Sequence, residues 1–244
     1  MSLSQSVQQR LDTAKVMQLA YRPNAEVAGQ IKQKDIVMFV GPAGCGKSYL
    51  MQQIDDLNAD STRVVDITSR PPRADDTPGS MIYIAHDDAN INDMLGRIER
   101  GELVQWSVHP TTGYFYATTI DGYKSENNLL EVLSSMVTYM RTLPFHRATV
   151  IGVATDPSQW EAWFNSRFPI GSDERHKRLQ EAIMSLEWLT DATHGSLVQW
   201  VINTPGGSGA EDALAIIRQT SYGGEGRTTA LSMLEWARSQ FVSS

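Results

Sequence analysis

The sequence has a single cysteine, Cys45, among its 244 residues. One cysteine cannot form a disulfide within the chain, which favours a reducing compartment. No apolar run approaches the roughly 20 residues of a membrane-spanning helix, and residues 1–5 lack the basic and apolar regions of a signal peptide. These absences predict a cytoplasmic protein without a membrane partner.

Positive charge is also scarce, since 21 Lys and Arg residues stand against 28 Asp and Glu residues and give a net charge of −7. A general nucleic-acid binder carries a basic surface, so the composition excludes that class of protein. The five histidines show no metal-ligand spacing. Because the chain is acidic as a whole, any anion site must be built from a local group of basic residues. The length of the chain suits one large or two small globular domains.

One short segment carries a specific chemical signal. Residues 41–48 read Gly-Pro-Ala-Gly-Cys-Gly-Lys-Ser and match the phosphate-binding pattern G-x-x-x-x-G-K-S/T, which a chain of this size meets by chance about once in a hundred. The plain alternative is a Gly-rich turn with a surface lysine. In the functional interpretation, backbone N–H groups and Lys47 bind the phosphates of ATP, and the Ser48 hydroxyl ligates Mg²⁺. The predicted nucleotide contacts in this segment are Gly41, Pro42, Ala43, Gly44, Cys45, Gly46, Lys47, Ser48 and Tyr49.

The residues around this loop favour the nucleotide site. Residues 36–40 form a continuous apolar run, typical of a strand buried on both faces. After the loop, Leu50, Ile54 and Leu57 recur at helical spacing. Strand, loop and helix in this order direct the helix N-terminus at a bound anion.

The rest of the chain alternates strand and helix patterns, which predicts a parallel sheet with right-handed crossovers. Strands are expected at 62–67, 128–133, 148–154 and 197–202, with helices at 134–143, 160–164, 172–189 and 211–218. Residues 67–118 break the alternation, with a helix at 90–100 and an antiparallel pair at 103–108 and 113–118, and so predict an inserted lobe. Terminal helices are expected with apolar faces at Val7, Leu11, Ala14, Met17 and Tyr21, and at Leu231, Leu234 and Phe241.

A second anion site is predicted directly after the second strand. Arg70 and Arg73 are separated by two prolines, which fix the backbone between the two guanidinium groups. Two forked arginines suit bidentate binding of a second phosphate. The alternative is a solvated basic turn beside Asp75 and Asp76.

From here the chain resembles a known family. The pattern Thr-Ser-Arg-x-x-Arg-x-x-Asp-x-x-Gly at residues 68–79 resembles the signature of guanylate kinases. Residues 103–106 and 113–118 are similar to two of the family's strands, with two extra residues in the hairpin between them. Arg167 and Arg178 resemble the arginines of the family's lid, and Val201–Asn203 resembles its last core strand, whose asparagine lies near the adenine of ATP. The resemblance covers residues 36–218.

This resemblance implies an α/β fold with a P-loop NTPase-type parallel sheet flanked by helices, a small inserted NMP-binding lobe and a helical lid. The implied domain is residues 35–220, with the lobe at 67–120 and the lid at 165–180. A helical extension at 1–34 and a C-terminal helix at 221–244 lie outside it.

The implied activity is transfer of a phosphoryl group from ATP to a nucleoside monophosphate, with Mg²⁺. Lys47, Arg167 and Arg178 would be catalytic, Asn203 would contact ATP, and Glu131 would hold the metal with Ser48. Asp66 is a second candidate for the metal. The alternative for the lid arginines is a helix-surface pair among Asp173, Glu174 and Glu181. The acceptor would meet Asp66, Arg70, Arg73, Tyr83, Gln105, Tyr116 and Thr118.

The positions that read the base depart from the family. Gln105 stands where the family has a glutamate, and Asp66 stands where it has a serine near the guanine O6. Both changes would suit adenine or cytosine, Trp106 is expected to border the base, and GMP or dGMP is the acceptor that the resemblance implies. Open alternatives are another nucleoside monophosphate, a phosphorylated sugar, or a non-catalytic module that binds a phosphopeptide. The oligomeric state is not predicted.

Overall fold

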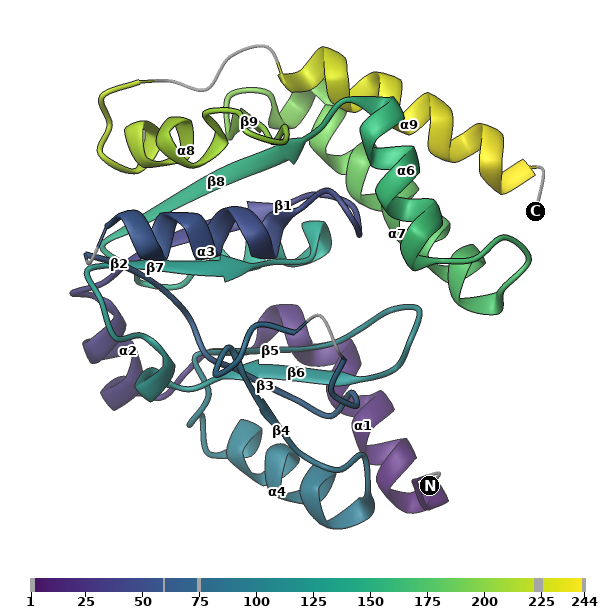
Figure 1. Ribbon diagram of the computed structural model, residues 1–244. Helices are drawn as coiled ribbons and strands as arrows, with labels where there is room; N and C mark the ends of the chain where they lie inside the picture. The colour runs from purple at the N-terminus through teal and green to yellow at the C-terminus, as the bar shows by residue number, and fades with distance from the viewer. Residues whose placement is uncertain (1–2, 59, 74–75, 222–225, 243–244) are drawn as a thin grey trace.

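A computed structural model describes residues 3–58, 60–73, 76–221 and 226–242. These segments form a five-stranded sheet, a separate four-stranded sheet and the helices packed around them (Figure 1). Within the described part of the chain, the helices are all too short or too polar to cross a membrane.

The larger sheet is parallel throughout, as predicted. Its strand order is β2-β7-β1-β8-β9, and every neighbouring pair runs in the same direction. Helices flank it, with α3 packed against α8, and α9 packed against β8 and β9 (Figure 1). The strands are β1 (Asp35–Val40), β2 (Ser61–Arg63), β7 (Asn127–Glu131), β8 (Arg147–Ala154) and β9 (Val198–Ile202).

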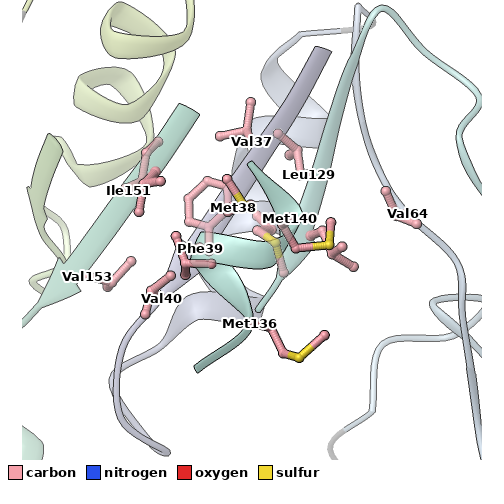
Figure 2. Packing of buried hydrophobic residues seen from close by; sticks show 14 of the residues in the cluster. Val37, Met38, Phe39, Val40, Val64, Leu129, Met136, Met140, Ile151 and Val153 are labelled. Atoms are coloured by element: carbon pink, nitrogen blue, oxygen red, sulfur yellow. The ribbon is translucent and has the colours of Figure 1, made fainter. Parts of the chain in front are cut away.

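The central strand β1 explains the apolar run before the loop. All six of its residues are buried, because it has a strand on each side and helices over its faces. Val37 is the register partner of Leu129 on β7, and Phe39 is the partner of Ile151 on β8 (Figure 2). A strand enclosed in this way has no solvent side, so its residues do not alternate between apolar and polar.

The smaller sheet has the order β4-β3-β6-β5 and contains the predicted antiparallel pair. One of its sides is covered by α1 (Gln5–Met17) and α4 (Asp88–Glu99), which pack together and are joined by the ion pair of Arg10 and Glu99 at 2.9 Å (Figure 1). Its strands are β3 (Asp66–Thr68), β4 (Met81–Tyr83), β5 (Gln105–Val108) and β6 (Phe115–Thr118).

The prediction of one strand at residues 62–67 is wrong. β2 ends at Arg63 in the large sheet, and β3 begins at Asp66 in the small sheet. The Val64 N–H still bonds the Leu129 carbonyl at 2.8 Å before the chain leaves the large sheet. A short run of β-prone residues looks the same whether one sheet or two sheets receive it, because strand pairing is non-local.

The remaining helices follow the sequence pattern with three differences. Residues 134–143 form only a short 3₁₀ turn and α5, and α2 was not predicted. On α9 the buried face is Ala230, Met233, Leu234 and Ala237, while Leu231 is exposed, because small side chains let this helix approach α7 closely.

The other α-helices are α2 (Ala25–Ile31), α3 (Lys47–Leu57), α5 (Val137–Met140), α6 (Pro157–Arg167), α7 (Asp173–Thr190), α8 (Gly209–Ile217) and α9 (Gly226–Val242). Short 3₁₀ turns lie at Gln18–Ala20, Ile120–Gly122, Ser134–Met136 and Ala192–His194.

Candidate active site

One cavity of about 990 Å³ lies between the two sheets. It is lined by the loop at residues 41–48, by one face of the small sheet, by the arginine turn that follows β3, and by α6 and α7. Most of the site residues expected from the sequence meet here. They are Gly41, Ala43, Gly44, Gly46, Lys47, Ser48, Tyr49, Asp66, Arg70, Arg73, Gln105, Tyr116, Glu131, Arg167, Arg178 and Asn203.

The loop at residues 41–48 joins β1 to α3, so the predicted order of strand, loop and helix is confirmed. Gly44 and Gly46 have φ angles of 78° and 83°, in the left-handed region that glycine adopts without strain. Gly46 is the N-cap of α3 and supplies no side-chain hydrogen bond to the first turn. The N–H groups of that turn remain available to an anion, whose charge the helix dipole also favours.

Side chains from two other parts of the chain hold this loop. The Trp160 indole N–H donates to the Ala43 carbonyl at 2.9 Å, and the Asn203 amide donates to the Cys45 carbonyl at 3.0 Å. Asn203 therefore shapes the loop, in addition to lining the cavity where the sequence places ATP. Cys45 stands at a variable position of the loop pattern, and its side chain is fully buried.

Lys47 and Ser48 lie against the end of β7. The Ser48 hydroxyl donates to the Glu131 carboxylate, and Lys47 Nζ lies 3.9 Å from the other Glu131 oxygen. Burial raises the pKa of Glu131, but the charges of Lys47 and Arg63 outweigh it and lower the pKa below the usual range. Glu131 is therefore ionised, beside a hydroxyl, as a magnesium ligand needs to be.

The cavity face of the small sheet carries two rows of polar side chains. Asp66, Thr118 and Gln105 are cross-strand partners on β3, β6 and β5, so their side chains share one face. Two residues further along, Tyr116 is the partner of Thr68 and Ser107 in the same way. The opposite face is apolar and packs toward α1 and α4.

Within the first row the three side chains have different environments. Gln105 and Asp66 line the cavity, and burial raises the pKa of Asp66 to about 8, so its carboxyl group is protonated at neutral pH. Thr118 is fully buried, and its hydroxyl bonds the Tyr123 hydroxyl at 2.9 Å. The prediction that Thr118 contacts the acceptor is therefore not supported by its position, because Tyr123 holds the hydroxyl within the sheet.

The arginine turn contains an acidic partner, Asp76, which the sequence interpretation named only in the alternative of a solvated basic turn. Asp76 accepts both terminal nitrogens of Arg70, at 2.8 and 2.5 Å, the Tyr83 hydroxyl at 2.5 Å and the Arg73 N–H at 2.7 Å. Burial opposes ionisation of Asp76, but these hydrogen bonds lower its pKa well below the usual range. Arg70 is thus already paired, and the guanidinium group of Arg73 is the more accessible of the two. The signal available in the sequence was an acidic residue, Asp76, six positions after Arg70.

Four arginines approach one another around the cavity. Burial, together with the charges of Arg178, Arg70 and Arg167, lowers the pKa of Arg73. Such mutual repulsion costs free energy in the folded chain and is relieved by a bound anion. Arg178 also has the ion pairs expected from the helix-surface alternative, yet its guanidinium lines the cavity rather than an outer surface.

Two tryptophans do not match their predicted places. Trp106 was expected to border the base, but it lies on the apolar face of the small sheet, stacked on Phe115 at 5.9 Å between ring centroids. Side chains alternate along a strand, so Trp106 points away from its neighbour Gln105. The apolar neighbours of Trp163 in the sequence predict a core position, but Trp163 lines the cavity, and its ring lies beside Gly46.

Comparisons with known proteins give a consistent, partial likeness. Three curated guanylate kinases match: one from Synechococcus sp. is 31% identical over 83 residues, one from Thermosynechococcus vestitus 26% over 83, and one from Thermobifida fusca 30% over 80. These matches cover 34, 34 and 33% of this chain and 36, 40 and 39% of the relatives, so the chain matches less than half the length of each. The predicted resemblance to guanylate kinases is confirmed over about a third of this chain.

Two further comparisons concern family models and solved structures. A search against models of known protein families gives no match for this chain. Among solved structures, the crystal structure of guanylate kinase from Anaplasma phagocytophilum aligns with a TM-score of 0.49 and 13% sequence identity, over 77% of this chain and 85% of that one.

Proposed function

We propose that this divergent guanylate kinase-like chain transfers the γ-phosphoryl group of ATP to GMP or dGMP, yielding ADP and the nucleoside diphosphate. The observation that carries the proposal is the shared cavity, in which the loop at residues 41–48 faces the polar side of the small sheet. Its volume of about 990 Å³ is at the upper end for ligand pockets and leaves room for two nucleotides. Phosphoryl transfer depends on positioning and charge neutralisation more than on covalent chemistry.

The donor phosphates would bind at the N-terminus of α3. Lys47 now donates to the Gly41 and Pro42 carbonyls, both at 2.9 Å, and would exchange these bonds for phosphate oxygens. Magnesium fits Ser48 and Glu131, whose oxygens are adjacent and of the hard type that Mg²⁺ prefers. Bound there, Mg²⁺ neutralises charge on the phosphates. Asp66 is the weaker metal candidate, because its carboxyl group is protonated at neutral pH.

No larger protein cage is needed for the metal. Across the described residues, no group of three or more His, Cys, Asp or Glu side chains could hold an ion. Magnesium usually keeps several waters and takes phosphate oxygens as ligands beside one or two carboxylates. Ser48 and Glu131 supply one hydroxyl and one carboxylate, which agrees with this coordination of magnesium.

The acceptor would lie on the small sheet. Arg73 and Tyr116 would hold its phosphate, with Arg70 and Tyr83 fixed around Asp76 at the same place. A protonated Asp66 can donate a hydrogen bond to the guanine O6, which an ionised carboxylate cannot. The Gln105 side-chain oxygen can accept from a guanine N–H group. Burial of Asp66 thus supports guanine at a position where the sequence had favoured another base.

The arginines of α6 and α7 would neutralise the transferring group. Arg167 and Arg178 both line the cavity, and Arg178 Nε is buried without a hydrogen-bond partner among the described residues. A positioned arginine of this kind raises the rate by about 10³–10⁵-fold. The regions that carry these arginines and the acceptor residues correspond to the proposed lid and NMP-binding lobe.

An ATP-consumption assay across all nucleoside monophosphates tests the proposal. ADP release should depend on GMP or dGMP, and Lys47→Ala should lower kcat/KM by at least about 10²-fold, as loss of one charge-stabilising group does. Lys32→Ala, an exposed lysine outside the cavity, is the matched control and should leave the rate unchanged. A preference for AMP or CMP would refute the guanine assignment. Absence of release with every monophosphate would refute the nucleoside monophosphate kinase and favour a kinase of a phosphorylated sugar or a phosphopeptide-binding module.

A further inference from the structure

A buried carboxylate, Glu181, lines the cavity close to the lid arginine Arg178. Glu181 on α7 lines the cavity, and its Oε2 accepts from Arg178 Nη1 at 2.7 Å. Burial opposes its ionisation, but a hydrogen bond from His109 and the charge of Arg178 lower the pKa of Glu181 to about 2. It is therefore negatively charged at ordinary pH, where it would oppose phosphate binding unless it has another role.

The second partner of Glu181 comes from across the cavity. His109 begins the hairpin loop between β5 and β6, and its Nε2 lies 3.4 Å from the same Glu181 oxygen. The side chains of His109, Glu181 and Arg178 are only 7, 16 and 8% exposed. One carboxylate oxygen thus links the small sheet to α7, where the two sides of the cavity meet.

The hydrogen bonds of the imidazole assign its proton. Nδ1 faces the backbone N–H groups of Thr111 and Thr112, both at 3.4 Å. A backbone N–H only donates, so Nδ1 accepts, and the neutral ring carries its proton on Nε2. The Nε2 N–H group is then the His109 donor nearest to Glu181, at 3.4 Å, and this contact needs no charge on His109.

The same arrangement leaves part of Arg178 available. The guanidinium group has five N–H donors in a fixed plane, and Glu181 holds it through Nη1. Nε lies 3.7 Å from Glu174, beyond hydrogen-bond distance, and is buried without a hydrogen-bond partner among the described residues. Because Glu181 fixes one end of this planar guanidinium group, its other N–H donors keep a defined direction.

We infer that His109 and Glu181 are positioning residues: the hairpin, through His109, holds Glu181, and Glu181 holds the Arg178 guanidinium in the orientation that meets the transferring phosphoryl group. The inference rests on the proposed function, which it deepens by two residues that do not themselves touch the substrate. It also assigns a role to the hairpin, which has two residues more than the family pattern, because the loop that contains His109 reaches α7.

Paired substitutions separate positioning from packing. His109→Ala removes the N–H donor, whereas His109→Gln keeps an N–H donor at the end of a side chain of similar reach. We expect His109→Ala to lower kcat by about 10–100-fold, the range for groups that orient a functional side chain, with KM for ATP nearly unchanged. His109→Gln should recover most of that loss. Glu181→Ala should lower kcat at least as far.

Two matched controls lie outside the cavity. Glu187→Gln breaks an ion pair on the same helix, with Arg238 at 2.7 Å, and His146→Ala breaks a His–carboxylate contact with Asp35 at 2.8 Å. Both should leave kcat unchanged. A loss of kcat in His146→Ala equal to that in His109→Ala, or a His109→Gln variant no better than His109→Ala, would overturn the inference.

Amide hydrogen exchange of the free protein provides a readout that does not depend on activity. The amides of residues 111–114 and 178–185 should exchange faster in His109→Ala than in the wild type and at the wild-type rate in His109→Gln. Unchanged exchange in His109→Ala would refute the link between hairpin and α7. If the exchange result holds while the wild-type protein phosphorylates no monophosphate, the proposed function fails and the link stands without its catalytic role.

Discussion

At the scale of single residues, burial changes what an acidic side chain can do. Asp66 and Glu131 both line the cavity, yet burial raises the pKa of Asp66 to about 8 while Lys47 and Arg63 keep Glu131 ionised. One carboxyl group can then donate a hydrogen bond, and the other carries the charge that a metal ligand needs. Both side chains end in a carboxyl group, so the difference between their pKa values comes from their neighbours.

The protonation of Asp66 predicts a pH dependence of acceptor binding. As the pH rises through about 8, Asp66 loses its proton and can no longer donate to the guanine O6. KM for GMP should therefore rise about tenfold between pH 7 and pH 9, since a group with this pKa is then about nine-tenths ionised. Asp66→Asn keeps a donor that does not titrate, and its KM should stay nearly level across the same range. Initial-rate measurements at fixed ATP check both expectations.

The same proton also links stability to pH. The folded chain holds the Asp66 proton up to about pH 8, whereas the unfolded chain releases it near the usual pKa of about 4. Stability from this group is therefore present at low pH and lost as the pH rises between these values. Urea unfolding should show a smaller decline with pH in Asp66→Asn than in the wild type. An identical decline in both would contradict the assignment.

At the scale of elements, α6 and α9 support the loop at residues 41–48. Trp160 of α6 bonds the Ala43 carbonyl and packs edge-on against Trp236 of α9, with ring centroids 4.8 Å apart. Phe164 and Trp236 extend the same aromatic group at 5.7 Å. The C-terminal helix, which lies outside the guanylate kinase resemblance, therefore braces the segment that would hold the donor phosphates.

This contact predicts the effect of removing one hydrogen bond. Trp160→Phe removes the hydrogen bond to the partly buried Ala43 carbonyl, which should lower the free energy of unfolding by about 1 kcal/mol. KM for ATP should rise as well, because the loop loses a support. Trp188→Phe, which removes a ring stacked on His194 away from the cavity, is the control. If the two variants change KM for ATP equally, the aromatic group has no special relation to the loop.

At the scale of the whole molecule, two sheets with different topologies enclose one site. The large parallel sheet brings the loop and Glu131, and the small mixed sheet brings the row at Asp66, Thr118 and Gln105. The helices α6 and α7 close the cavity with Arg167 and Arg178. Donor and acceptor groups can meet only because these three parts face one another.

The shared cavity predicts the behaviour of a ligand that occupies both halves. An adenosine–guanosine bisubstrate analogue, joined through phosphates, should raise the melting temperature more than ATP and GMP raise it separately at equal concentration. A ligand at 100 times its Kd stabilises the folded state by about 2.7 kcal/mol, so tighter binding at fixed concentration is measurable. Lys47→Ala should reduce the shift. An analogue that stabilises no more than ATP alone would show that the two halves do not bind together.

Local features of the site were predictable from the sequence. The apolar run of β1, the left-handed glycines of the loop and the helical spacing after them each depend on a few consecutive residues. The antiparallel pair β5 and β6 was predictable for the same reason, since a hairpin joins neighbouring segments. The division of residues 62–67 between two sheets was not, because it depends on partners more than fifty residues away, such as Asn127–Glu131.

Amino-acid order alone was enough to predict that a loop with the phosphate-binding pattern stands between a buried strand and a helix, because backbone freedom and side-chain spacing are local properties. The folded structure decided which polar groups remain available there. Asp76 occupies Arg70, Glu181 orients Arg178, and burial protonates Asp66. Ion pairing and pKa depend on distance in space and on desolvation, and both are set only when segments far apart in the chain come together.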